Sequence, residues 1–300
     1  MRLRHSLLSG LGAVVAGVVL VAGPAQADCT LSIQPALDQW LIQHDPFAGD
    51  SLQRQFDVAV VNLGDTPCVG RIGVDLRGEA FGLTKPGDDA QIAYALIDER
   101  GGNDVTPRTG QSSRRLNAQP ISLAGGDRTL VRFTFAADTE AGMGQGVYSQ
   151  TAYISVADDN GLPLAEHPVS LAINVIPAAV MGLKGEFQRV NGVARIDLGE
   201  LTPGPKTLGT SLFVLSTGGY RVSVQSFNQG RLRQGATEWY VNYGLSVGAS
   251  TINLATGGDI EVVSNRPRAD DYALTVNIGD VSGRRAGQYT DVLTLTVAAL

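Results

Sequence analysis

Apolar and polar side chains alternate along much of this 300-residue chain. In the run 289–297 threonines share one parity, and the other parity is mainly apolar, with Tyr289, Leu293, Leu295 and Val297. Successive side chains of a β-strand point to opposite faces, so this pattern gives one apolar face and one hydroxylated face. It predicts antiparallel sheets covered on one side, as in a β-sandwich.

An internal duplication accompanies the alternation. The run 146–156 matches the run 287–297 in its glycine, its tyrosine, its valine and its alternation. Further pairs of runs follow the same order: 130–135 with 273–278, 92–96 with 241–245, 69–74 with 221–224, and 56–62 with 211–216. Duplication on this scale predicts two tandem all-β sandwich domains, at 28–177 and 178–300. Helical patterns are scarce, and only Pro35 to Gln43 is expected to form a helical turn or two.

The second copy ends one strand before the first. An Asp-Asp-Asn-Gly turn at 158–161 and a β-rich run at 169–175 follow the first copy of the closing motif. After the second copy the sequence has only Ala298, Ala299 and Leu300. We therefore expect a self-completed first domain and a second domain that lacks its last strand.

An incomplete sandwich exposes a sheet edge, and such an edge pairs with a strand from elsewhere. The expected strand-acceptor edge carries Tyr289, Leu293, Leu295 and Val297. The alternative is that the segment Met181–Val190 pairs beside this edge and closes the domain from within the chain.

The first 27 residues have the features of a signal peptide. A basic start is followed by an apolar stretch from about Leu7 to Ala22 and by the small-residue site Ala25-Gln26-Ala27. No later stretch reaches the roughly 20 apolar residues of a membrane span. We expect an exported protein with no membrane span after cleavage. Its two cysteines, Cys29 and Cys68, then predict one disulfide.

Composition and motifs argue against several classes of function. The formal net charge of −6 disfavours nucleic acid and anionic membranes as partners. No catalytic, cofactor-binding or metal-binding motif is found, so no enzyme activity and no cofactor are expected. The remaining polar and aromatic candidates are interpreted as solvated, turn, core or rim residues: His44, Phe47, Trp40, Arg100, Arg108, Arg114, Arg115, Asp158, His167 and Trp239. The alternative for the four arginines is contact with an anionic glycan or surface.

The tandem units resemble spore coat protein U domains, which are similar to the subunits of archaic chaperone–usher pili. The resemblance lies in the early pair Cys29 and Cys68, in the strand motifs around Tyr94 and Tyr243, and in the ending 286–297. It implies an immunoglobulin-like fold that is incomplete until a periplasmic chaperone, and then the next subunit, supplies a strand. The second domain departs from the family because it has no cysteines.

The resemblance predicts a secreted adhesive or structural subunit of a chaperone–usher pilus or surface fibre. Its expected partners are a periplasmic chaperone and usher, a neighbouring subunit that donates a strand, and a surface or glycan receptor. Its expected route is through the periplasm to the cell surface or the extracellular space. If cleavage follows Ala27, only Asp28 precedes Cys29, and a subunit without a segment to donate is expected at the tip. The alternative is a free secreted binding protein, such as a carbohydrate-binding β-sandwich.

Overall fold

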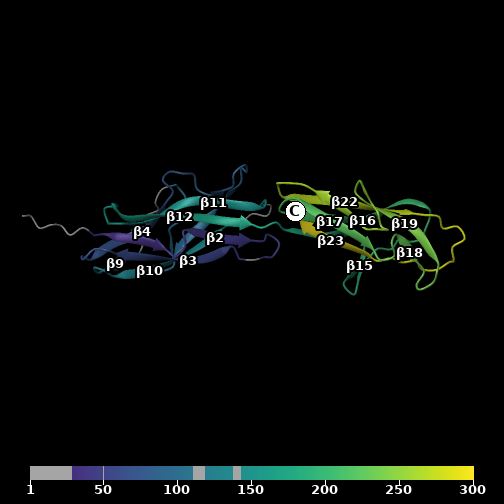
Figure 1. Ribbon diagram of the computed structural model, residues 1–300, viewed down its shortest axis with the longest axis horizontal. Helices are drawn as coiled ribbons and strands as arrows, with labels where there is room; N and C mark the ends of the chain where they lie inside the picture. Colours follow the sequence, from purple (N-terminus) through teal and green to yellow (C-terminus); the bar gives the residue numbers. More distant parts are fainter. Residues whose placement is uncertain (1–28, 50, 111–118, 138–142) are drawn as a thin grey trace, which may run out of the picture.

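The computed structural model describes residues 29–300, except 50, 111–118 and 138–142. It shows an elongated molecule with two all-β lobes joined end to end (Figure 1). Two tandem all-β sandwich domains, expected from the alternation and the duplication, are confirmed, and their layout is consistent with the immunoglobulin-like fold that the resemblance implies. The predicted signal peptide lies outside the described residues. Within the described part, no helix is long and apolar enough to cross a bilayer.

One sheet of the first domain has the strand order β1-β3-β10-β7-β8. Its strands are β1 (Leu31–Pro35), β3 (Gln53–Asn62), β10 (Arg128–Ala137), β7 (Tyr94–Asp98) and β8 (Asn103–Asp104). The facing sheet has the order β2-β12-β11-β4-β9, with β5 and β6 beside it. Its strands are β2 (Gln39–His44), β12 (Pro163–Val175), β11 (Gly146–Ala157), β4 (Cys68–Asp75), β9 (Ile121–Leu123), β5 (Leu83–Thr84) and β6 (Gln91–Ile92).

The prediction of a helical turn between Pro35 and Gln43 is wrong. The segment contains the end of β1 and most of β2, which pairs in parallel with β12. Trp40 is 1% exposed and stacks on Phe56, with ring centroids 4.9 Å apart. Burial of this indole against the opposite sheet decides the conformation, because tertiary packing overrides weak local propensity.

The second domain has a sheet of order β13-β16-β22-β19-β18, with β20 paired to β19. Its strands are β13 (Ala179–Gly185), β16 (Gly204–Ser216), β22 (Arg268–Ile278), β19 (Tyr240–Val247), β18 (Arg231–Arg233) and β20 (Ser250–Ile252). The other sheet has the order β21-β17-β23. It contains β21 (Gly258–Val262), β17 (Tyr220–Ser226) and β23 (Leu293–Ala299), and a separate hairpin joins β14 (Gln188–Val190) to β15 (Val193–Arg195).

The two domains repeat the same plan. The order β1-β3-β10-β7 in the first domain corresponds to β13-β16-β22-β19 in the second. The order β4-β11-β12 corresponds to β17-β23, with no strand in the place of β12 among the described residues. The runs matched in the sequence therefore occupy equivalent strands. Each domain has its own apolar core, one within residues 31–175 and the other within 212–278.

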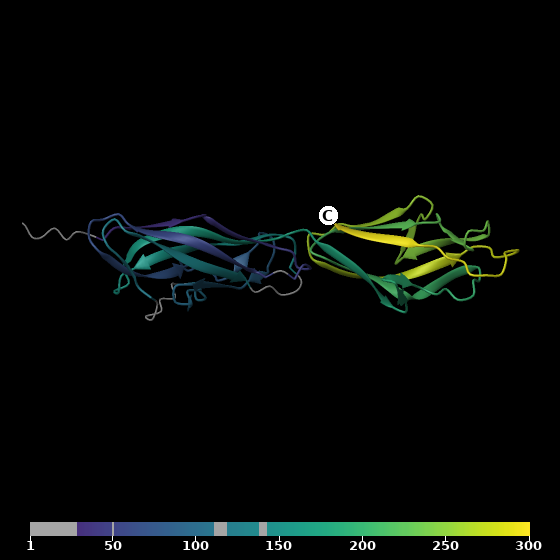
Figure 2. The same cartoon turned by 90° about the horizontal axis from the view of Figure 1, so that it is seen from below.

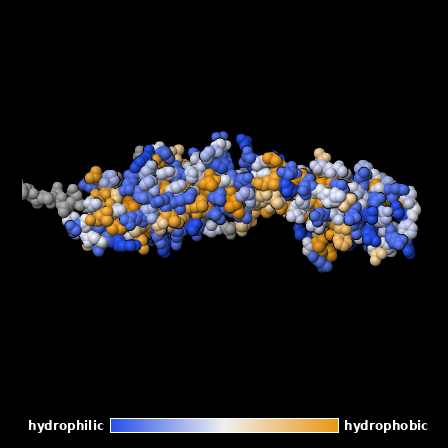
Figure 3. Space-filling model, in the orientation of Figure 1, coloured by the Kyte–Doolittle hydropathy of each residue, from blue (hydrophilic) through white to orange (hydrophobic). Residues whose placement is uncertain are grey.

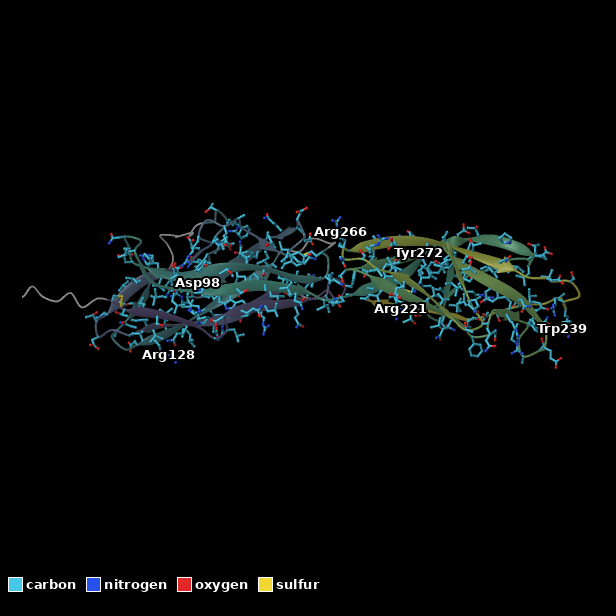
Figure 4. All side chains as sticks on the ribbon, turned by 45° about the horizontal axis from the view of Figure 1, so that its top comes forward. Asp98, Arg128, Arg221, Trp239, Arg266 and Tyr272 are labelled. Carbon is cyan, nitrogen blue, oxygen red and sulfur yellow. A yellow bond between two sulfur atoms is a disulfide. The ribbon has the colours of Figure 1, made fainter. Side chains whose placement is uncertain are left out.

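The predicted disulfide is confirmed. Cys29, just before β1, is bonded to Cys68 at the start of β4, and their Cα atoms are 5.4 Å apart. The bond links one sheet of the first domain to the other. It lies at the end of that domain farthest from the second domain (Figure 4).

Candidate functional site: the open edge of the second domain

β23 is paired on one side only. It forms an antiparallel ladder with β17, from Ser226 opposite Leu293 to Tyr220 opposite Ala299. In the part of the chain that the structure describes, no strand pairs with its other side. In Figure 2 β23, in yellow, runs along one side of the second domain toward the linker. Its outer main-chain groups are thus available for a further strand.

The alternation expected for β23 is present. Leu293, Leu295 and Val297 are half-buried and pack against the second core, whereas Thr294 and Thr296 are exposed. On the opposite sheet, the edge strand that contacts β23 is β13. Its Met181 and Leu183 are also half-buried against that core. We call these two strand edges, with their five apolar side chains, the open edge.

Met181–Val190 does not close this edge. Residues 181–185 belong to β13, which pairs with β16 from Ala179 opposite Ser216 to Gly185 opposite Thr210. Residues 188–190 form β14, which pairs only with β15. The alternative considered from the sequence, in which this segment pairs beside β23 and closes the domain, is therefore not the arrangement in the structure.

The first domain shows what a closed edge looks like. The residue equivalent to Leu295 is Ile154, which is 1% exposed, and the residue equivalent to Val297 is Val156, which is 0% exposed. β12 pairs with β11 along its whole length. It contributes four alternating side chains that are at most 1% exposed: Val169, Leu171, Ile173 and Val175. β23, the equivalent of β11 in the second domain, has no such covering strand among the residues that the structure describes.

Tyr289 does not lie in β23, although the sequence grouped it with the three apolar residues of that strand. It precedes β23, is half-buried, and donates a hydrogen bond from its hydroxyl to the main-chain oxygen of Arg285 (2.7 Å). The neighbouring Thr290 forms an isolated β-bridge with Arg233. The structure therefore places Leu293, Leu295 and Val297 together on one strand and puts Tyr289 in the loop leading to it.

A carboxylate fixes the start of β23. Asp291 accepts hydrogen bonds from the hydroxyls of Tyr243 (2.6 Å) and Ser226 (2.5 Å), and from the main-chain nitrogens of Asn228 and Val292 (2.9 and 2.7 Å). Burial, together with the hydrogen bond to Asp291, raises the pKa of Tyr243 far above its usual value. The network ties the loop before β23 to β17 and β19.

The other end of β23 lies against the first domain. The main-chain nitrogen of Leu300 donates to the oxygen of Gly219 (2.9 Å), and the Leu300 oxygen accepts a hydrogen bond from the Gln145 side chain (3.3 Å). Gln145 also donates from its main chain to the Thr217 oxygen (2.8 Å). Thr217 is 1% exposed, and its hydroxyl contacts the main chain of Ile176 and Ala178 in the linker. One end of the open edge is thus occupied by the junction between the domains.

The other sequence candidates do not converge on this site. Asp158 begins the turn between β11 and β12, as expected, and accepts from the main-chain nitrogen of Leu162 (2.7 Å). Arg100 and Arg108 are paired with Asp98 and Asp104. Arg114 and Arg115 lie outside the described residues, and within the described part no cluster of His, Cys, Asp or Glu has the arrangement of a metal site. Trp40 is a core residue, Phe47 is half-buried, and Trp239 is 38% exposed.

A group of arginines around Tyr240 was not recognised from the sequence. Arg231 and Arg284 lie 53 positions apart, yet their guanidinium carbons lie 4.9 and 5.2 Å from the centre of the Tyr240 ring. Only the fold brings these residues together, beside the loop that leads into β23.

Comparisons with known proteins give similarities of fold. No protein-family model and no curated protein matches the sequence. A solved structure of a chaperone–tip adhesion subunit pre-assembly complex from archaic chaperone–usher Csu pili of Acinetobacter baumannii is similar, with 15% identity and a TM-score of 0.46 over 86% of this chain and 97% of that one. The CupB6 tip adhesin from Pseudomonas aeruginosa has 11% identity and a TM-score of 0.40 over 91% and 95%. CfaE, the adhesive subunit of CFA/I fimbria of enterotoxigenic Escherichia coli, has 12% identity and a TM-score of 0.37 over 87% and 92%.

Proposed function

We propose that the second domain accepts a β-strand from another protein chain at the open edge, and that the protein is a non-enzymatic subunit of a chaperone–usher type pilus or surface fibre. The observation that carries this proposal is the contrast between two equivalent strands. β11 is covered by β12 and its inward apolar side chains are fully buried, whereas β23 has no strand on its other side among the described residues and its leucines and valine are half-buried.

The energy available from such a strand is large. Each Val or Leu that passes from exposed to fully buried contributes roughly 1.5–3 kcal/mol. A strand with the alternation of β12 would insert several such residues and would complete the burial of Leu293, Leu295 and Val297. It would also pair the main-chain groups on the free side of β23. One donated segment would therefore give the second domain both additional buried apolar side chains and an additional row of main-chain hydrogen bonds.

The assignment to a pilus or fibre rests on the resemblance to spore coat protein U and archaic pilus domains together with this edge. In that scheme a periplasmic chaperone supplies the first strand, an usher exports the complex, and a neighbouring subunit supplies the final strand. The first domain, closed by its own β12, is free to carry a surface or glycan receptor site. This is the arrangement of a tip subunit on the cell surface.

The free secreted binding protein is the weaker candidate. It requires Met181–Val190 to lie beside β23, but that segment pairs with β16 and within its own hairpin.

A peptide with the sequence of β12, Pro163–Val175, tests the proposal. Added to the full chain, it should bind with one equivalent and raise the melting temperature of the second domain. A control peptide with asparagine in place of Leu171 and Ile173 should do neither, because the alternating apolar face is lost. A second domain whose melting is indifferent to both peptides would overturn the proposal.

A further inference from the structure

The end of the second domain farthest from the first carries an unusual group of side chains. Four exposed arginines lie there with a half-buried tyrosine and a partly exposed tryptophan: Arg231, Arg233, Arg284, Arg285, Tyr240 and Trp239. We call this group the arginine–aromatic end. Figure 4 labels Trp239 at this far end, well separated from Arg266, which lies near the first domain. In Figure 3 the same end is mainly hydrophilic.

Three of the four arginines have contacts that hold them in place without neutralising their charge. Arg233 donates a hydrogen bond to the main-chain oxygen of Thr237 (3.1 Å). Arg231 and Arg284 lie over the Tyr240 ring, within the distance of a cation–π contact. None of the four arginines forms an ion pair with a carboxylate of the described residues. The chain as a whole has a net charge of −6, so this concentration of cations stands out.

The two carboxylates of the loop between β22 and β23, Asp280 and Asp291, have partners of their own. Asp291 is engaged by Tyr243, Ser226 and the main chain. Hydrogen bonds from the Ser282 side chain and from the Ser282 main-chain nitrogen (2.9 Å) lower the pKa of Asp280, and the field of Arg284 adds to this effect. Glu238, next to Trp239 in the sequence, is exposed and forms no ion pair with the four arginines. The guanidinium groups therefore retain most of their capacity for an external acidic partner.

The arginine–aromatic end adjoins one end of the open edge. The side chain of Gln234 donates to the oxygen of Ala286 (2.9 Å), and Phe227 donates from its main chain to the oxygen of Val292 (2.9 Å). Phe227 is 82% exposed and Val292 is 57% exposed. Aromatic residues and arginine are the types enriched in the centres of protein interfaces. Leu300, at the other end of β23, is already in contact with the first domain.

The first domain supplies the precedent. β12 completes that domain antiparallel to β11 and then continues into the second domain. The second domain packs against the loop that leads into β11, through Gln145 with Thr217 and through Gly144 beside Pro267. The loop that leads into β23 is the equivalent loop of the second domain, and it carries Arg284 and Arg285.

We infer that the arginine–aromatic end is the docking surface for the folded body of the protein that donates the strand, and that this body presents an acidic face there. The inference rests on the proposed function and adds to it a docking surface and a partner chemistry. The donated strand runs antiparallel to β23, as β12 runs to β11. Its C-terminal end emerges at the arginine–aromatic end, where the donor's folded domain follows.

Tailed peptides test the inference on the full chain. The β12 peptide Pro163–Val175 is extended at its C-terminus by four glutamates, four lysines or a glycine–serine tail. We expect the glutamate tail to tighten binding roughly tenfold over the glycine–serine tail, and the lysine tail to weaken it. The advantage should fall as salt is raised, because exposed charges are screened. The same glutamates placed before Pro163, at the junction end, should give little gain.

Variants distinguish a failure of this inference from a failure of the proposed function. In R231E/R284E the preference between glutamate and lysine tails should reverse, while the untailed peptide binds as before and shows that the domain is folded. R266E, near the junction, is the matched control and should leave the C-terminal tail effect unchanged. If no peptide binds, the proposed function fails and the inference fails with it. If all the tails bind equally, or if the arginines bind heparin without any tail effect, the inference alone is overturned.

Discussion

Val156 and Val297 are valines at equivalent positions of β11 and β23, yet Val156 is fully buried and Val297 is only half-buried. The difference has one visible cause, which is that β12 covers β11 and no described strand covers β23. Equivalent valines in two copies of one fold thus give an internal comparison of a closed and an open sheet edge.

Alanine substitution of these two valines should have unequal effects. V156A should lower the free energy of unfolding of the first domain by about 2–3 kcal/mol, from lost transfer energy and a residual cavity. V297A should cost the second domain less, about 1 kcal/mol, because the side chain is already partly exposed to water. Chemical denaturation followed separately for each domain measures both. Adding the β12 peptide should increase the cost of V297A and leave that of V156A unchanged, and equal costs in the free chain would contradict the account.

Removal of the disulfide should affect only the first domain. Cys29 and Cys68 are separated by 39 positions, and opening a loop of that length costs about 4 kcal/mol in the chain-entropy model. Calorimetry of C29S/C68S should show one transition shifted down and the transition of the cysteine-free second domain in place. A shift of both transitions would mean that the domains unfold as one unit.

The junction between the domains should loosen when Gly218 acquires a side chain. A Cβ at this position would lie 2.7 Å from the Gln145 side chain, which would have to leave its place against Leu300. G218A should therefore broaden the range of interdomain orientations seen by small-angle scattering, without lowering the stability of either core. Q145A should do the same from the other side of the contact. A rigid junction in both variants would show that Gln145 does not hold the domains together.

Alkaline pH should destabilise both domains. Burial raises the pKa of Tyr94 in the first domain and the pKa values of Tyr220 and Tyr243 in the second far above the ordinary value. The folded state keeps these protons, so the stabilisation is complete below pH about 10 and is lost as the pH rises above it. Tyrosinate absorbance should appear together with loss of structure. Y243F should make the second domain less sensitive to high pH, and titration of all tyrosines near pH 10 without unfolding would refute this.

Patterns within strands were readable from the sequence, whereas contacts between distant segments were not. The alternation in 289–297 and the matched runs gave β-strands and their order, since side-chain parity is a local property. The interpretation of Pro35 to Gln43 was wrong because the burial of Trp40 depends on β12 and β3. Tyr289 has the same parity as the apolar residues of β23, and parity alone placed it in that strand. β23 begins only at Leu293, after the loop that contains Tyr289. Each arginine around Tyr240 was unremarkable by itself, and only the packing of β18, β19 and the loop before β23 assembles them.

Hydrogen exchange along β23 tests the central claim most directly. In the free chain, the amides of Leu293–Ala299 that point away from β17 should exchange fast, while the amides of Gly146–Ala157 that point toward β12 stay protected. Binding of the β12 peptide should protect the outward amides of β23 and leave β11 unchanged. Full protection of β23 in the free chain, or peptide binding that leaves its exchange as it was, would contradict a strand-accepting edge.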